Sequence, residues 1–149
     1  MPARKKSESS SGPTLRGGVK PYGRKKGEKY MNKKQLAHFR TMLLAWRKEL
    51  LDELSRTVHQ MRDEPTLHPD PNDRASRETD ISLELRSRDR ESKLVKKIDE
   101  ALERIESGDY GYCDVCGVEI GVERLEARPT AELCIDCKTL DEIREKQMA

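Results

Sequence analysis

Apolar residues recur at steps of three and four in two long stretches of the chain, over about residues 32–63 and 72–107. This spacing places them along one face of a helix, as at the core positions of a coiled coil. The first series is Leu36, Phe39, Leu43, Trp46, Leu50, Leu54, Val58 and Met61. The second is Ile81 and Leu85 and then, after a polar gap over residues 86–93, Leu94, Val95, Ile98, Ala101, Leu102 and Ile105. The pattern therefore predicts two long helices.

Residues 64–71 separate the two helices and contain three prolines, which cannot continue a helix. Asn32 is a suitable N-cap for the first helix, and Gly108 is a suitable C-terminal stop for the second. Two helices joined by so short a turn form an antiparallel hairpin, here over residues 31–108 and about 50 Å long. The fold class that we predict is mainly α.

The turn of this hairpin, near residues 68–75, is acidic. Asp70, Pro71 and Asp73 fit the N-cap, first position and capping partner of the second helix, which is a purely structural explanation. The functional alternative is that Asp70 and Asp73 reach a basic or metal-bearing partner. Both interpretations are compatible, because a capped helix start also fixes where the carboxylates point.

All four cysteines lie in the last part of the chain. Cys113 and Cys116 form one C-x2-C pair, and Cys134 and Cys137 form another 17 residues further on. A spacer of roughly 15–20 residues between two such pairs is typical of a tetrahedral zinc site. We expect one structural zinc ion, with a rubredoxin-like iron or redox-active disulfides as the alternatives.

Residues 109–149 are therefore predicted to form a zinc-finger module that ends in a C-terminal helix over residues 138–147. Leu140 and Ile143 share one face of this helix. Four thiolates around Zn²⁺ carry a net charge of about −2, so cations are expected nearby. Arg124, Arg128 and Lys138 are the candidates, either as compensating charges or as an anion-binding set.

Charge is divided unevenly along the chain. Residues 1–30 carry nine Lys/Arg against two Glu, whereas residues 31–149 carry 21 basic and 26 acidic residues. We interpret residues 1–30 as a basic, flexible leader, with contact to nucleic acid or to an acidic protein as the alternative. The acidic remainder argues against an autonomous DNA-binding protein.

The composition also excludes several classes of protein. Charged residues make up 39% and hydrophobic residues 34% of the chain, which is too polar for a large enzyme core. The longest apolar run, residues 42–46, is far shorter than the roughly 20 residues of a membrane span. No apolar signal segment follows the charged N-terminus, so we expect a cytoplasmic protein with reduced cysteines.

Several motifs together resemble the bacterial DksA/TraR family over about residues 30–149. They are Asp70-Pro-Asn-Asp-Arg-Ala75, Ser82-Leu-Glu-Leu-Arg86, Gly108-Asp-Tyr-Gly-Tyr-Cys113, Cys116-Gly117, Arg124-Leu-Glu-Ala-Arg-Pro-Thr130 and Leu133-Cys-Ile-Asp-Cys-Lys138. The resemblance implies a protein without enzymatic activity that binds RNA polymerase, inserts its hairpin through the secondary channel and destabilises open complexes. It also implies joint action with guanosine tetraphosphate (ppGpp), repressing ribosomal RNA promoters and activating some amino-acid biosynthesis promoters.

The resemblance further implies roles for individual residues. The function of the tip falls on Asp70, Asp73 and Ala75, and a polymerase contact falls on Arg90. The ppGpp site, shared with the polymerase, falls on Leu94, Lys97, Arg128 and Lys138, and the zinc ligands are Cys113, Cys116, Cys134 and Cys137. The chain departs from the family pattern near the tip, notably at His68, where the family pattern leads us to expect an aromatic residue. Because a histidine titrates near pH 6.5 when unperturbed, we predict that His68 makes activity mildly dependent on pH.

Three other functions compete with this interpretation. A Gre-type transcript-cleavage factor would act in the same channel, but such factors lack a four-cysteine module. A zinc adaptor that binds nucleic acid directly would need exposed basic or aromatic residues, whereas the zinc segment is rich in acids. A structural coiled-coil dimer is disfavoured because the prolines in the middle favour an intramolecular hairpin, and hence a monomer.

Overall fold

The computed structural model describes residues 14–63 and 70–148. Its helical elements are a short 3-10 helix, η1 (Arg16–Gly18), and four α-helices. These are α1 (Lys33–Asp63), α2 (Pro71–Ser107), α3 (Val122–Ala127) and α4 (Ile135–Met148). Within the described residues the only β pairing is the isolated bridge between Tyr112 and Glu119. The mainly helical fold class is confirmed.

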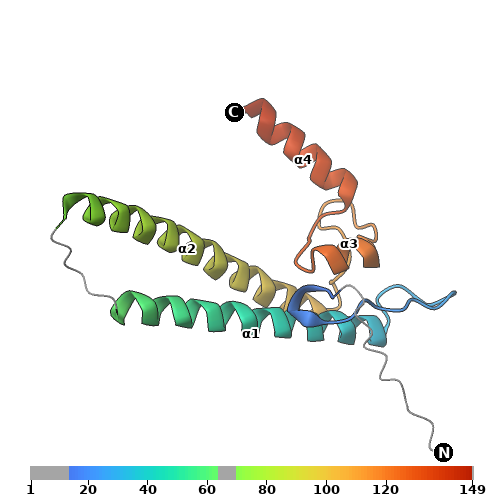
Figure 1. The fold of residues 1–149 in the computed structure, drawn as a ribbon. Coiled ribbons are helices and arrows are strands. Elements are labelled where there is room, and N and C mark those ends of the chain that lie inside the picture. Colours follow the sequence, from blue (N-terminus) through green and yellow to red (C-terminus); the bar gives the residue numbers. More distant parts are fainter. Residues whose placement is uncertain (1–13, 64–69, 149) are drawn as a thin grey trace, which may run out of the picture.

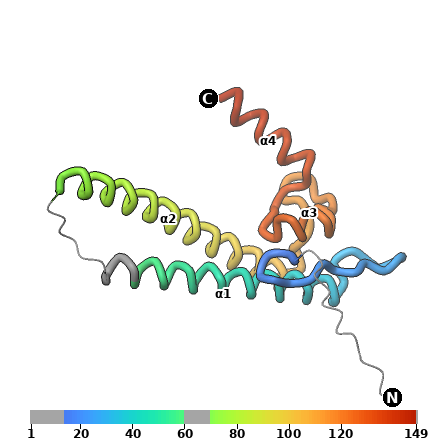
Figure 2. Tube along the Cα trace, in the orientation of Figure 1, coloured from blue at the N-terminus to red at the C-terminus, as the bar shows by residue number. Residues whose placement is uncertain are grey.

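Helices α1 and α2 run side by side in opposite directions and form a long arm, with α3 beside the base of that arm and α4 projecting away from it (Figure 1). At 1.5 Å per residue, the 37 residues of α2 span about 55 Å. The trace in Figure 2 places the segment before α1 along the base of the arm as well. The base is therefore where three parts of the chain meet.

The ends of the long helices are capped by local side chains. Asn32 accepts a hydrogen bond from the Gln35 N–H (2.9 Å) and Gln35 accepts one from the Met31 N–H (2.8 Å), a reciprocal cap at the start of α1. At the start of α2, the Asp70 carboxylate accepts from the Asn72 N–H (3.0 Å). Gly108 ends α2 in the left-handed region, at φ +84°. The predicted caps at Asn32, Asp70 and Gly108 are confirmed.

Within the described residues, the core lies at the base of the arm. Buried side chains come from α1, α2 and the zinc-finger module, and they are Phe39, Met42, Leu43, Trp46, Leu50, Ile98, Ala101, Tyr110, Cys113, Ile120, Val122, Leu125 and Cys134. Among the described residues beyond Leu50 on α1 and before Ile98 on α2, none is buried. Leu85, a predicted core position, is 49% exposed. The coiled-coil pattern is thus realised as a packed core only near the base.

Residues 14–31, which we call the strap, lie against this base. Leu15 and Val19 pack on the core, and the Arg16 guanidinium lies 4.6 Å from the centroid of the Trp46 ring. Gly17, at φ +75°, approaches α1 so closely that a Cβ would lie 2.8 Å from the Cβ of Ala45. Part of the segment that we predicted as a flexible leader over residues 1–30 therefore packs on the core, through Leu15 and Val19. Residues 1–13 lie outside the described part.

The C-terminal helix also differs from its prediction. It begins at Ile135 rather than near residue 138, so that Cys137 lies in its first turn. Leu140 and Ile143 are 56% and 46% exposed, so the face that they share has no packing partner within the described residues. None of the described helices is long and apolar enough to cross a membrane.

Candidate functional site

The four cysteines form one cluster. Their sulfur atoms all lie within 4.8 Å of one another, and Cys116 Sγ is 3.6 Å from Cys134 Sγ. Four sulfurs at about 2.3 Å from a tetrahedral Zn²⁺ stand roughly 3.8 Å apart, so this donor set fits zinc. The predicted ligands Cys113, Cys116, Cys134 and Cys137 are thus brought together from two distant pairs.

Each cysteine pair is held in place by backbone hydrogen bonds. Gly117, at φ +74°, donates to the Cys113 carbonyl (3.0 Å), and the Cys113 N–H donates to the Val118 carbonyl (2.8 Å). The Asp114 N–H donates to the Glu132 carbonyl (2.9 Å) and so joins the two pairs. The backbone N–H groups of Cys116 and Cys134 lower the pKa of Cys113 to about 6, whereas side-chain hydrogen bonds with Cys134 and Cys116 raise the pKa of Cys137. Cys113 is therefore the first of these two thiols to become a thiolate.

The zinc-finger module is attached to the base of the arm by α2. Arg104 donates through Nη2 to the Tyr112 carbonyl (2.9 Å) and to the Asp114 carboxylate (3.2 Å). Tyr110 is buried, and its hydroxyl donates to the Pro129 carbonyl (2.7 Å). Burial raises the pKa of Tyr110 far above its usual value, so the phenol stays neutral. The module is therefore fixed beside α2.

A basic hollow lies where the module meets α2. It is lined by Lys97 of α2, Arg128 at the end of α3, Lys138 of α4, and also Arg124, Glu100, Thr130, Ala131, Glu132 and Leu133, and its volume is about 320 Å³. Three of the four residues predicted for the ppGpp site, Lys97, Arg128 and Lys138, thus share one cavity. Leu94, the fourth, is half-buried against the core and does not line it. A polyphosphate suits such converging cations.

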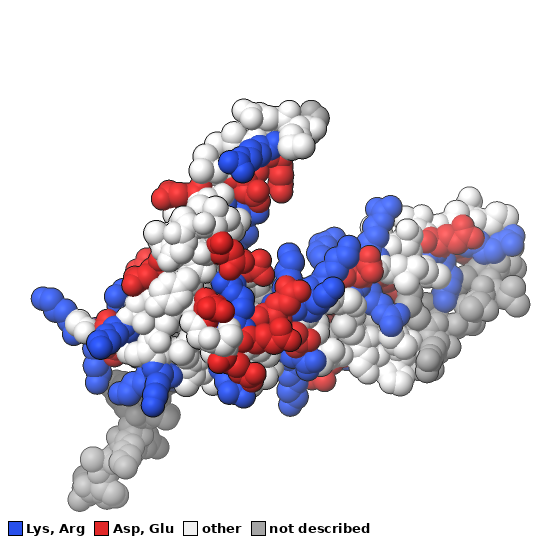
Figure 3. All heavy atoms as spheres, turned by 180° about the vertical axis from the view of Figure 1, so that it is seen from behind, with Lys and Arg blue, Asp and Glu red and all other residues white. Residues whose placement is uncertain are grey.

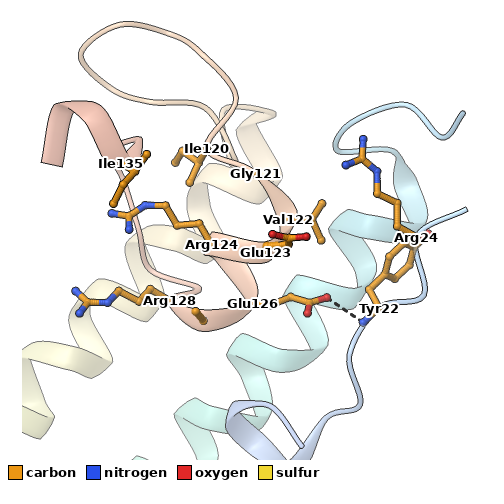
Figure 4. A pocket seen from close by; sticks show the side chains of 11 residues that line it. Tyr22, Arg24, Ile120, Gly121, Val122, Glu123, Arg124, Glu126, Arg128 and Ile135 are labelled. Atoms are coloured by element: carbon orange, nitrogen blue, oxygen red, sulfur yellow. Dashed lines mark hydrogen bonds between the residues drawn. The ribbon is translucent and has the colours of Figure 1, made fainter. Parts of the chain in front are cut away.

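A second hollow, of about 700 Å³, lies between the strap and α3 (Figure 4). The Tyr22 N–H donates to the Glu126 carboxylate (2.9 Å) on its wall. Arg124 and Arg128 line this hollow too, but in Figure 4 their guanidinium groups point away from Tyr22 and Glu126. The two arginines therefore form a boundary between both hollows.

The described end of the arm presents the predicted tip residues to solvent. Asp70, Asp73 and Ala75 are all exposed at the start of α2, far from the cysteine cluster. Asp70 is also the N-cap, so its capping role and its exposure coexist. Arg90 is exposed on α2 between this end and the basic hollow. His68 lies outside the described residues.

Charge is mixed over the molecule. On the face shown in Figure 3, acidic and basic side chains alternate along the arm and over α4, without a continuous basic surface. A protein that tracks a nucleic acid backbone would need a stripe of one sign. The face in Figure 3 carries no such stripe.

The sequence pattern did not indicate Tyr30, which joins the strap to the zinc-finger module. Its hydroxyl donates to the Gly111 carbonyl (2.7 Å) and accepts from the Gly121 N–H (2.9 Å). Burial raises the pKa of Tyr30, so the hydroxyl keeps its proton. The signal available in the sequence was a pair of tyrosines, Tyr22 and Tyr30, in an otherwise basic segment.

Family profiles match both parts of the chain. The profile described as the DnaK suppressor protein DksA, N-terminal domain, matches residues 35–105, and that of the prokaryotic DksA/TraR C4-type zinc finger matches residues 108–142. The second match, with the sulfur cluster, identifies a C4-type zinc finger.

Relatives along most of the chain carry the same description. The protein described as RNA polymerase-binding transcription factor DksA of Escherichia coli strain K12 is 65% identical over 89% of this chain and 87% of its own length. That of Haemophilus influenzae is 62% identical over 89% of this chain and 91% of its own length. Both are named as transcription factors, in agreement with the expectation of a non-enzymatic protein.

A solved structure agrees with the fold. The structure of transcription factor DksA2 from Pseudomonas aeruginosa matches with a TM-score of 0.72 and 44% identity, over 78% of this chain and 90% of that one. Both profiles, the curated relatives and this structure point the same way. The chain belongs to the DksA family.

Proposed function

We propose that this protein is a transcription regulator that binds RNA polymerase in the cytoplasm and inserts its arm into the secondary channel. The observation that carries the proposal is the similarity to a relative described as RNA polymerase-binding. The two sequences are 65% identical over 87% of the relative's length. The arm supports it, because a hairpin about 55 Å long and two helices wide can enter a narrow channel. We expect the protein to act as a monomer and without reading a DNA sequence.

The exposed carboxylates of Asp70 and Asp73 are the groups proposed to act in the channel. They stand at the far end of the arm from the zinc-finger module, so the base can stay outside while they approach the active-site magnesium. Two carboxylates are fewer than an independent metal site usually needs. Their proposed effect is therefore electrostatic, and it destabilises open complexes rather than cleaving the transcript.

Two further residues of α2 belong to the proposed polymerase-binding surface. Ala75 follows the two carboxylates near the start of the helix, and Arg90, closer to the base, is proposed to contact the polymerase.

The basic hollow is proposed as this protein's half of a ppGpp site that the polymerase completes. Lys97, Arg128 and Lys138 come from three different helices or helix ends and line one cavity. Glu100 and Glu132 line it as well, so the hollow alone is a weak anion site, and a partner would have to supply further cations. Leu94 packs on the core one helical turn before Lys97, so its proposed contribution is to hold this part of α2 in place rather than to contact the ligand. With ppGpp, the protein represses ribosomal RNA promoters and activates some amino-acid biosynthesis promoters.

The test is the half-life of an open complex at a ribosomal RNA promoter, measured with purified polymerase, with and without ppGpp. The wild-type protein should shorten the half-life, and ppGpp should shorten it further. The variant Asp70→Asn/Asp73→Asn should bind the polymerase and leave the half-life unchanged. Because Asn also caps helices well, this variant removes charge while keeping the start of α2.

A matched control is Glu103→Gln/Glu106→Gln, which removes two exposed negative charges from α2 near the base. This control should behave like wild type. Equal loss of activity in both double variants would contradict the role of the tip and point to net charge. A wild-type protein that binds without changing the half-life would favour the Gre-like alternative, which a transcript-cleavage assay then tests.

A further inference from the structure

We infer that Tyr30 is a positioning residue, which through its hydroxyl holds the start of α3 and so sets the place of Arg128 in the basic hollow. The inference rests on the proposed function, because it concerns the residues of the proposed ppGpp site. Tyr30 itself does not line that hollow.

The Tyr30 hydroxyl joins both ends of the segment that carries the first cysteine pair. It donates its proton to the Gly111 carbonyl (2.7 Å), two residues before Cys113, and accepts from the Gly121 N–H (2.9 Å). A phenol has a single proton to donate, so the donor is fully used. The Ile120 N–H also donates to the Gly111 carbonyl (2.8 Å) and closes the same ring of contacts.

The contact to Gly121 has no substitute within α3. Gly121 is the N-cap of this helix, and no side chain caps it. The first amides of a helix have no partner inside the helix and need an outside acceptor. The Tyr30 oxygen supplies that acceptor for the Gly121 N–H. Its loss would leave this amide of a half-buried residue without its partner.

A shift of Gly121 would also shift Arg128, because the two residues flank the short helix α3. Helix α3 has six residues, Val122–Ala127, and Arg128 is its C-cap, with its N–H bonded to the Arg124 carbonyl (2.8 Å). Arg124 in turn donates through Nε to the Leu133 carbonyl (3.1 Å), on the wall of the basic hollow. Lys97 belongs to α2 instead. The spacing of Lys97 and Arg128 therefore depends on how the module is fixed to the base.

The Tyr30 ring is itself held on two sides. It forms an edge-to-face pair with the Tyr112 ring, with centroids 5.6 Å apart. Gly111, at φ +92°, leaves no room beside it, because a Cβ there would lie 2.7 Å from Met31 Cγ and 3.1 Å from the Tyr30 oxygen. Since the reciprocal cap at Met31 and Gln35 anchors the next residues to α1, Tyr30 connects α3 to the arm.

The test compares Tyr30→Phe with Tyr22→Phe. The Tyr22 hydroxyl bonds to Glu28 (3.0 Å) within the strap and does not reach the module, so it is a matched control. The measured quantity is the ppGpp concentration that half-maximally shortens the open-complex half-life, with the full chain and polymerase. We expect about a fivefold increase for Tyr30→Phe, the effect of one hydrogen bond, and no change for Tyr22→Phe. In an Arg128→Ala background, Tyr30→Phe should add nothing.

A second readout needs neither polymerase nor ppGpp. Hydrogen exchange of the Gly121 amide, followed by NMR, should speed up in Tyr30→Phe and stay unchanged in Tyr22→Phe. An unchanged half-maximal concentration in Tyr30→Phe would overturn the inference, and so would an equal increase in the Arg128→Ala background. A wild-type protein that ignores ppGpp would contradict the proposed function alone, and the exchange rates would then decide the positioning role.

Discussion

Arg47 of α1 and Asp99 of α2 are joined across the arm, with 2.7 Å between Nε and Oδ1. Both side chains are partly exposed, at 37% and 48%. Arg47 and Asp99 follow the core residues Trp46 and Ile98 in the sequence, and the core extends on α1 as far as Leu50. The pair therefore joins the two helices near the outer end of the packed base.

Breaking this pair should cost little stability. For Arg47→Gln we expect a loss of about 1 kcal/mol in the free energy of unfolding, since a charge-assisted hydrogen bond at a half-exposed site is weakened by solvent. Urea denaturation of Arg47→Gln, Asp99→Asn and the double variant measures the coupling. The exposed pair Asp89–Lys93, at 3.8 Å, is the control and should show almost none. Equal coupling in both pairs would show that the Arg47–Asp99 contact has no special strength.

Substitutions at two adjacent glycines of the strap can distinguish the cost of backbone strain from the cost of a steric clash with α1. Gly17 and Gly18 have φ of +75° and +73°, but only Gly17 would place a Cβ against α1. Gly18→Ala should therefore cost about 1 kcal/mol from strain alone, whereas Gly17→Ala should also lift the strap from Trp46. Trp46 is the single tryptophan, so its fluorescence reports the change. Identical fluorescence spectra for the two variants would contradict the close contact of Gly17 with α1.

Loss of zinc should unfold the module and leave the arm helical. Cys137→Ser removes a ligand, and in zinc-finger peptides metal binding supplies about 10–16 kcal/mol at pH 7. We expect NMR signals of residues 109–148 to lose dispersion while those of the outer arm persist. Asp136→Asn, an exposed neighbour between the second pair of cysteines, should keep both zinc and signals. Retention of one zinc per chain by Cys137→Ser would contradict the four-ligand site.

His38 should make stability depend on pH. Burial lowers its pKa despite the nearby Glu126 carboxylate, and its Nε2 has no hydrogen-bond partner among the residues that the structure describes. The unfolded chain, with a His pKa near 6.5, then binds more protons than the folded chain as the pH falls. Stability should therefore decrease as the pH drops through about 6.5, and level off below the pKa of folded His38.

The measurement is the difference in unfolding free energy between wild type and His38→Gln at several pH values from 5 to 8. This difference isolates His38 from the other histidines, because they remain in both proteins. A difference that stays constant over this range would show that His38 has the same pKa in the folded and unfolded chains.

The sequence predicted most of what depends on local chemistry. The caps at Asn32 and Asp70 and the stop at Gly108 follow from short-range hydrogen bonding and backbone preference, so they could be read directly. The C-x2-C spacing likewise determines which sulfurs can meet. The prediction that Lys97 lies near Arg128 and Lys138 depended on the family resemblance, because no local rule places a helix residue beside a zinc-finger module.

The strap could not be predicted from local rules. Leu15 and Val19 are isolated among glycines and basic residues, so they show neither a helical nor a strand period. Their burial depends on a surface that α1 and the module create only after folding. The exposed Leu85 has the opposite cause, since periodicity gives the face of a helix but not its separation from the next one.

The absence of buried residues in the described outer half of the arm has a consequence for how this protein can change. Substitutions there remove little apolar packing, so the base stays folded whatever the outer arm presents. The end of the arm can therefore be exchanged for a segment of similar helical propensity without rebuilding the scaffold. Both evolution and protein engineering can therefore change activity at the tip without changing stability at the base.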